Sequence, residues 1–151
     1  MTEFNSGWLI SGPADSLDSQ LLEEIIATFR EQMGLSSNCY ASLVVCSADQ
    51  MRSLNLRYRG TDATTDVLSF PADRESGIFR EDESGSIYLG EILVDINYIL
   101  SQSNSTDINK EIIPVLVHGL LHLLGFDHLS SSQQIKMREL ENKIIAKIRT
   151  V

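Results

Sequence analysis

The hydrophobic and polar positions follow two different periods along the chain, one typical of strands and one typical of helices. A short apolar run at 8–10 precedes a Gly-Pro pair and predicts a first strand. Apolar residues then recur every three or four positions over 17–29, which predicts an amphipathic helix that Gly34 ends. We expect Asp15 or Ser16 to cap the start of this helix.

The middle of the chain contains three further predicted strands. The run 40–46 is rich in residues that favour β-structure, and Ser47 can start a short helix directly after it. The remaining predicted strands are 67–70 and 88–95. The acidic, glycine-containing segment 71–86 between them is long for a loop in a compact domain, which leaves an ordered flap and a disordered segment as alternatives.

The last third of the chain predicts two helices of different character. The segment 109–124 is apolar on nearly every side and predicts a buried helix that Gly125 ends. Pro114 should either bend this helix or lie in its first turn. A serine followed three residues later by a glutamine, at 130–133 or 131–134, resembles a capping box and predicts the start of a final amphipathic helix.

Length and composition predict one domain over residues 1–151. A chain of 151 residues that is 42% hydrophobic and 22% charged can bury one core of its own. Because strands and helices are interleaved, we expect an α+β or a mixed α/β domain. Cys39 and Cys46 fit neither a disulfide framework nor a four-cysteine zinc site, so we expect reduced thiols. The N-terminus lacks the pattern of a secretory signal, and no apolar run is long enough to span a bilayer, so we expect a cytoplasmic protein with no membrane partner.

The charge is strongly negative but unevenly distributed. A formal net charge of −9 argues against a surface that binds nucleic acid on all sides. However, the stretch 50–60 holds three arginines and no acid, and bases outnumber acids from residue 133 onward. The sequence leaves open a local basic groove and ordinary solvated helix faces.

All three histidines of the chain lie within one short segment, HGLLHLLGFDH. His118 and His122 are four residues apart on a predicted helix, so their rings project from the same face. Gly125 can turn the chain after the helix and bring His128 to the same point. Three imidazoles at about 2.0–2.1 Å from one zinc ion leave a fourth position open, as in catalytic zinc sites. The same ligands also accept nickel, copper or cobalt.

The alternative is that these histidines are polar core residues bonded to backbone carbonyls. This interpretation is the weaker one, since each buried imidazole without a partner costs about 1–3 kcal/mol. The ligand spacing also matches that of the metzincin metalloproteases, which carry a glutamate directly after the first histidine as general base. That position is Gly119 in this chain. The glycine predicts free space beside the metal, either for a bulkier substrate or for a base from elsewhere.

Three motifs in the same order resemble the YbeY family of bacterial rRNA maturation endoribonucleases. They are the histidine segment, NLRYRGTDATTDVLSFP at 55–71 and LGEILVD at 89–95. The resemblance covers roughly residues 50–130. It implies a single α+β domain, a small mixed β-sheet packed with several helices, with a zinc ion held by His118, His122 and His128 at the end of a buried helix. It also implies a single-strand-specific endoribonuclease that acts in 16S rRNA 3′-end maturation, ribosome biogenesis and ribosome quality control, with ribosomal RNA and ribosomal subunits or ribosome-associated proteins as partners.

The resemblance also assigns candidate catalytic residues outside the histidines. Arg59 corresponds to a family arginine, and a planar guanidinium suits a phosphate because it donates two parallel hydrogen bonds. Glu91 stands where the family usually has aspartate, so it either orients a ligand or water, or is simply a buried or sheet-edge residue. Asp127 either orients a histidine ring or shapes its loop through an Asx turn. We expect zinc to polarise the phosphate or activate water while Arg59 stabilises the developing charge, with Glu91, Asp127 and the RNA 2′-hydroxyl as candidates for moving the proton.

Two other functions remain open at this point. The first is a zinc metalloprotease or other amide hydrolase, which the ligand spacing favours and Gly119 opposes. The second is a ribosome-assembly or RNA-binding factor in which the zinc is mainly structural. The sequence leaves the oligomeric state open.

Overall fold

The computed structural model describes residues 2–72, 81–127 and 129–148 of the chain. The strands among these residues are β1 (Thr2–Asn5), β2 (Trp8–Ser11), β3 (Cys39–Val45), β4 (Val67–Pro71) and β5 (Ile87–Val94). The helices are α1 (Ser19–Gln32), α2 (Ala48–Arg59), α3 (Ile96–Ser101), α4 (Ile108–Leu123) and α5 (Ser131–Lys147). Segment 73–80, which holds the centre of the predicted flap, lies outside the described residues, and so does His128.

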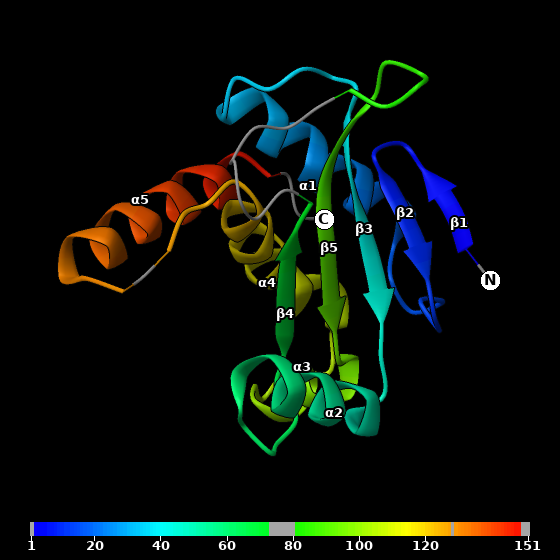
Figure 1. Cartoon of the computed structure of the whole chain (residues 1–151), viewed down its shortest axis with the longest axis vertical. Coiled ribbons are helices and arrows are strands. Elements are labelled where there is room, and N and C mark those ends of the chain that lie inside the picture. The colour runs from blue at the N-terminus through cyan, green and yellow to red at the C-terminus, as the bar shows by residue number, and fades with distance from the viewer. Residues whose placement is uncertain (1, 73–80, 128, 149–151) are drawn as a thin grey trace.

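The strands form one mixed sheet in the order β1-β2-β3-β5-β4. The inner pairs β2–β3 and β3–β5 are parallel, and the outer pairs β1–β2 and β4–β5 are antiparallel. Helices α1, α4 and α5 gather on one side, while α2 and α3 close the lower end (Figure 1). This arrangement confirms the predicted α+β fold with a small mixed sheet.

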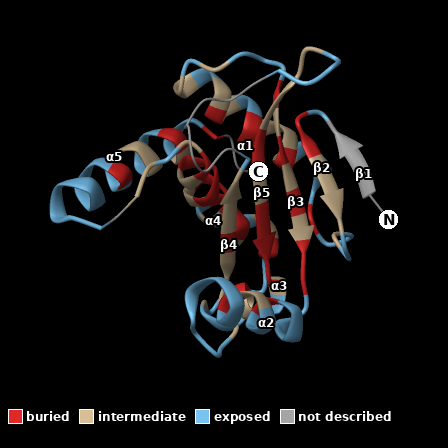
Figure 2. Ribbon diagram, in the orientation of Figure 1, coloured by how far each residue is buried: buried red, intermediate tan, exposed pale blue. Residues whose placement is uncertain are grey.

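The core divides into a large and a small cluster on the two faces of the sheet. The large cluster joins the sheet to α1, α4 and α5, and Trp8 anchors it by donating a hydrogen bond of 2.8 Å from Nε1 to the Leu22 carbonyl. The small cluster lies between the sheet and α2; its buried members are Cys46, Met51, Leu68 and Leu93. Helix α4 is buried along most of its length, whereas α2 and α5 expose a long face (Figure 2). The histidine helix α4 is therefore held between the sheet and the helices α1, α3 and α5.

The predicted helix caps are confirmed in two of three cases. Ser47 and Gln50 form a capping box at the start of α2, and Ser130 and Gln133 form one at the start of α5. At the start of α1 the prediction of Asp15 or Ser16 is wrong. The helix begins later, because the Asp18 carboxylate accepts hydrogen bonds from the backbone N–H groups of the first turn.

Pro114 lies inside α4, beyond its first turn. The first-turn alternative was therefore wrong. Proline cannot donate the hydrogen bond that the Lys110 carbonyl would otherwise accept. Both Pro114 and Lys110 are exposed, so the missing bond lies on the side of the helix that faces water. The residues on the buried side of α4 contact the core and follow one another at the regular helical spacing.

Two elements were absent from the sequence-based prediction. Strand β1 joins β2 through a tight turn in which Ser6 has φ 23° and Gly7 has φ 110°. Helix α3 begins one residue after Asp95, which was expected to end the strand and instead caps the helix through a hydrogen bond from the Tyr98 N–H. Cys39 and Cys46 are free and buried, as expected for reduced thiols. None of the helices in the described ranges is long and apolar enough to cross a membrane.

Candidate metal centre

Helix α4 brings two of the predicted ligands together. The Nε2 atoms of His118 and His122 lie 3.0 Å apart, and the two rings meet edge to face with centroids separated by 4.5 Å. Both side chains are half-buried. The i, i+4 spacing has therefore placed two ring nitrogens at a common point.

The separation of these nitrogens fits a shared metal ion. Two nitrogens bound tetrahedrally to zinc at about 2.0–2.1 Å are roughly 3.4 Å apart, so the observed 3.0 Å is within a few tenths of an ångström of that geometry. The third predicted ligand, His128, belongs to the undescribed part of the chain. Among the residues that the structure describes, no group of three or more histidine, cysteine, aspartate or glutamate residues is placed to hold a metal. The three-histidine set therefore stays a prediction.

Glu141 of α5 contacts the first of these histidines. The His118 Nδ1 atom lies 2.5 Å from Glu141 Oε1, and the two side chains are 33% and 22% exposed. An ionised carboxylate only accepts hydrogen bonds, so Nδ1 is the donor. A neutral His118 ring then carries its lone pair on Nε2, the atom that faces His122. The contact holds His118 in the tautomer that a metal needs.

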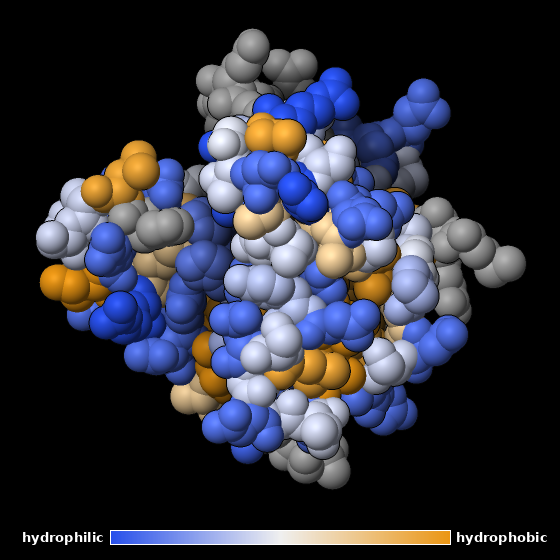
Figure 3. Space-filling model, turned by 90° about the horizontal axis from the view of Figure 1, so that it is seen from below, coloured by the Kyte–Doolittle hydropathy of each residue, from blue (hydrophilic) through white to orange (hydrophobic). Residues whose placement is uncertain are grey.

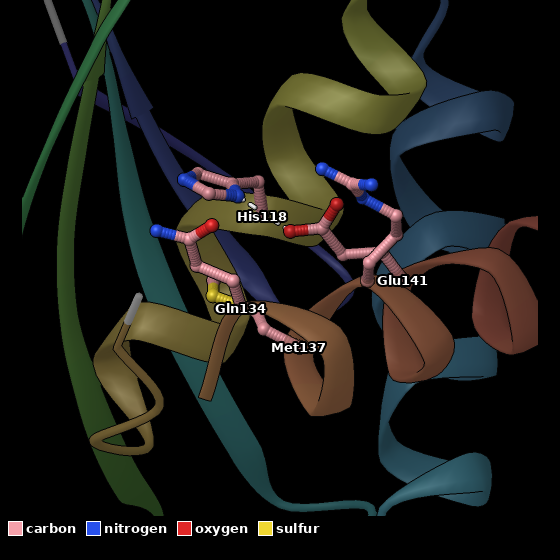
Figure 4. Close-up of a pocket in the computed structure, with 5 residues that line it drawn as sticks. His118, Gln134, Met137 and Glu141 are labelled. Atoms are coloured by element: carbon pink, nitrogen blue, oxygen red, sulfur yellow. Dashed lines mark hydrogen bonds and ion pairs between the residues drawn. The ribbon is translucent and has the colours of Figure 1, made fainter. Parts of the chain in front are cut away.

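A pocket of about 370 Å³ opens between α4 and α5 beside His118 (Figure 4). Its size is within the range of small-molecule and cofactor sites. The residues that line it are His118, Gln134, Met137, Arg138 and Glu141. Arg138 is exposed and forms no ion pair with another described residue. The pocket thus offers a cation within the same cavity as a candidate metal ligand.

Gly119 does not open space beside the histidines. It is buried, and a Cβ added there would lie 3.0 Å from Cδ1 of Ile92 and 3.2 Å from Oγ of Ser69. The sheet therefore fills the volume that a side chain at this position would occupy. Our expectation of room for a substrate or a separate base at this glycine was wrong, because the glycine allows α4 to pack closely on β4 and β5.

Arg59 lies apart from the histidine rings in the described structure. It is the last residue of α2, is exposed, and forms no hydrogen bond or ion pair with another described residue. Helix α2 packs against the small cluster, on the sheet face opposite the large one. Seen from below, the surface is mostly hydrophilic, with hydrophobic side chains in small separate groups (Figure 3). The phosphate-binding role of Arg59 stays a prediction.

Glu91 and Asp127 differ in how close they lie to the histidines. Glu91 follows the alternation of β5, so it faces the opposite side from Ile92, whose side chain meets Gly119 of α4. Its negative charge and that of Asp95 add to burial in raising the pKa of the Cys46 thiol, which belongs to the small cluster. Asp127 is half-buried in the loop that follows α4. The structure therefore keeps Asp127 near the histidine helix and turns Glu91 away from it.

Sequence reasoning missed Glu141 and Arg138. The signal for Glu141 was present in the spacing of α5, because Met137, Ile144 and Ile148 are buried on one stripe and Glu141 interrupts that stripe. A carboxylate at such a position needs a partner. The identity of that partner depends on how α5 packs against α4, which no local pattern specifies.

Comparison with known proteins identifies the family to which the chain belongs. The family model described as "Endoribonuclease YbeY" matches residues 13–149. The chain belongs to the YbeY family. An endoribonuclease YbeY from Desulforamulus reducens is 33% identical over 131 residues, covering 85% of each chain. Another from Thermodesulfovibrio yellowstonii is 37% identical over 111 residues, covering 72% of this chain and 66% of the relative.

A solved structure supports the same assignment. A solution structure of a protein from Thermotoga maritima matches with a TM-score of 0.54 and 27% identity, covering 92% of this chain and 86% of the other. The resemblance found in the sequence motifs is thereby confirmed at the level of the family and the fold. Membership of the YbeY family supports a nuclease of the hydrolase class that acts on RNA.

Proposed function

We propose that this protein is a zinc-dependent endoribonuclease that cleaves single-stranded RNA, with the 3′ end of 16S rRNA as its substrate in ribosome maturation and quality control. The observation that carries the proposal is the pair of Nε2 atoms 3.0 Å apart on α4 in a member of the YbeY family. The most economical explanation for two converging imidazole nitrogens beside an open pocket is a shared metal ion. His118 and His122 would hold it, with His128 as the third ligand.

The chain's own residues supply positioning and charge. A zinc ion held there brings Lewis-acid chemistry to a phosphodiester. Arg138, at the pocket wall, and Arg59, predicted from the family motif, are the two arginines proposed to bind phosphate oxygens through charge-assisted hydrogen bonds. Attack by the RNA 2′-hydroxyl needs no nucleophile from the protein, and Asp127 is better placed than Glu91 to act near the histidines.

The test is cleavage of a 16S rRNA precursor fragment with a single-stranded 3′ extension. Zinc-loaded protein should cleave it, while chelator-treated protein and His122→Ala protein should not. Arg59→Ala should reduce cleavage strongly, and Arg57→Ala on the same helix serves as the matched control with the same loss of charge. A duplex version of the fragment should resist cleavage. All samples are purified in parallel so that a contaminating nuclease would appear in each.

The outcomes separate the three functions that the sequence left open. Equal cleavage by the loaded, chelated and His122→Ala samples would overturn the proposal. Chelator-sensitive cleavage of an unfolded protein substrate, without RNA cleavage, would establish an amide hydrolase. RNA binding that Arg59→Ala weakens, with no turnover in any sample, would establish an assembly factor with structural zinc.

A further inference from the structure

We infer that Glu141 of α5 is the positioning residue of the metal site, orienting His118 and fixing its tautomer from the side of the ring away from the metal. This inference rests on the metal part of the proposed function and not on the identity of the RNA. It assigns a role to α5, a helix that contributes neither a motif nor a predicted ligand. Figure 4 shows the Glu141 carboxylate directed at the His118 ring across the pocket.

The two ring nitrogens of His118 face two different partners. His118 uses Nδ1 to donate to Glu141, at 2.5 Å, and directs Nε2 at His122, at 3.0 Å. Both nitrogens of one imidazole are therefore engaged, one by an acceptor and one toward the proposed metal position. A ring held at both edges cannot rotate freely about its χ angles, and a carboxylate behind a ligating histidine also increases the basicity of the ring.

Glu141 interrupts an otherwise buried and apolar stripe of α5. Positions 137, 144 and 148 of the same stripe are 2%, 0% and 6% exposed and carry apolar side chains. An apolar residue at 141 would satisfy the packing of α5 without loss of solvation for a charged group. Packing alone therefore does not explain why a carboxylate occupies this position. The hydrogen bond that Glu141 accepts from His118 does explain it.

Glu141 and His118 come from distant parts of the chain. Residues 118 and 141 are 23 residues apart and belong to different helices. The capping box of Ser130 and Gln133 fixes where α5 begins, and the packing of α5 against α4 then brings Glu141 to His118. The metal site therefore depends on the correct packing of α5 against α4, because only that packing forms the contact between Glu141 and His118.

The experiment measures zinc affinity with a competing chromophoric chelator, on the full chain, for wild type and three variants. Glu141→Ala removes the acceptor, and the expected result is about 10–100-fold weaker zinc binding. Glu141→Gln keeps an oxygen acceptor without the charge and should fall between Ala and wild type. Glu139→Ala removes an exposed carboxylate from the same helix and should leave the affinity unchanged.

Two further readouts distinguish positioning from simple packing. The visible spectrum of the cobalt-substituted protein should shift in Glu141→Ala, because the spectrum responds to ligand geometry, and should match wild type in Glu139→Ala. Thermal unfolding of the metal-free proteins shows whether each variant folds. If Glu141→Ala lowers the metal-free melting temperature but binds zinc as tightly as wild type with an unchanged cobalt spectrum, the contact only docks α5 and the inference is wrong.

These results separate the inference from the proposed function. Zinc binding that weakens in Glu141→Ala, in a protein that cleaves no RNA, would support the inference and overturn the endoribonuclease proposal. A wild-type protein that binds no zinc would overturn both. RNA cleavage by wild type, together with equal zinc affinity in all variants, would overturn the inference alone.

Discussion

Replacing Gly119 by alanine tests whether the sheet, and not free space, lies against the histidine helix. The added methyl carbon would lie 3.0 Å from Cδ1 and 3.2 Å from Cγ2 of Ile92, and 3.2 Å from Oγ of Ser69. Non-bonded carbons normally approach to about 3.5–4.0 Å. Either α4 or the Ile92 side chain must therefore move by several tenths of an ångström.

The size of the effect follows from two opposing contributions. Overpacking of this kind costs about 1–3 kcal/mol, while alanine in place of glycine inside a helix contributes about 1 kcal/mol in favour of folding. We therefore expect Gly119→Ala to lower the free energy of unfolding by about 0–2 kcal/mol. In open space the same substitution would raise it by about 1 kcal/mol.

A second substitution removes the ambiguity of a result near zero. Ile92→Val deletes Cδ1, the atom nearest to the new methyl group, and by itself costs about 0.5–1.5 kcal/mol. If the methyl group and Cδ1 compete for one volume, the double variant should be more stable than the sum of the single effects by at least about 0.5 kcal/mol.

The assay is urea-induced unfolding followed by the fluorescence of Trp8, the only tryptophan of the chain and a fully buried one. Each variant is also checked by far-ultraviolet circular dichroism. A stabilisation of about 1 kcal/mol in Gly119→Ala, with additive effects in the double variant, would refute the packing argument. It would also restore the earlier expectation that this glycine leaves room beside the metal.

Four further predictions concern the stability of the fold and the reactivity of its two thiols. Asp95→Ala should lower the free energy of unfolding by about 1–3 kcal/mol, since the buried carboxylate caps α3 and accepts a hydrogen bond from Thr64; a change below about 0.5 kcal/mol in urea unfolding would contradict this. Ser130→Ala should lower the free energy of unfolding by about 1 kcal/mol, because it removes the capping box of α5. An unchanged midpoint of urea unfolding would contradict this prediction. Burial raises the pKa of the Cys39 and Cys46 thiols, so both should react slowly with a thiol reagent at pH 8 until urea is added, and rapid labelling of the native protein would exclude this. The thiol pKa values in the folded state lie above those in the unfolded state, so the protonated thiols favour folding. Their contribution to the free energy of unfolding is complete below about pH 8.5 and is lost as pH rises further. Urea unfolding at a series of pH values measures this loss.

Local patterns predicted the parts of the protein that depend on neighbours in sequence. The i, i+4 spacing placed His118 and His122 on one face because the period of a helix is fixed by its backbone. Serine and glutamine three residues apart predicted the capping box of α5 for the same reason, since both partners lie within one turn, and Ser47 predicted where α2 begins. Strand β1 was missed because its four residues show no apolar alternation and are defined by pairing with β2.

The tertiary structure decided every feature that joins separate elements. The sequence by itself determined that two imidazoles share a helix face, that the chain is an α+β protein and, through its motifs, that it resembles the YbeY family. Only packing decided that Ile92 fills the space at Gly119, that Glu91 faces away from α4, and that Glu141 reaches His118. The physical reason is that a helical or strand period fixes which face a residue occupies, whereas the partner on the other side of that face depends on how whole elements dock.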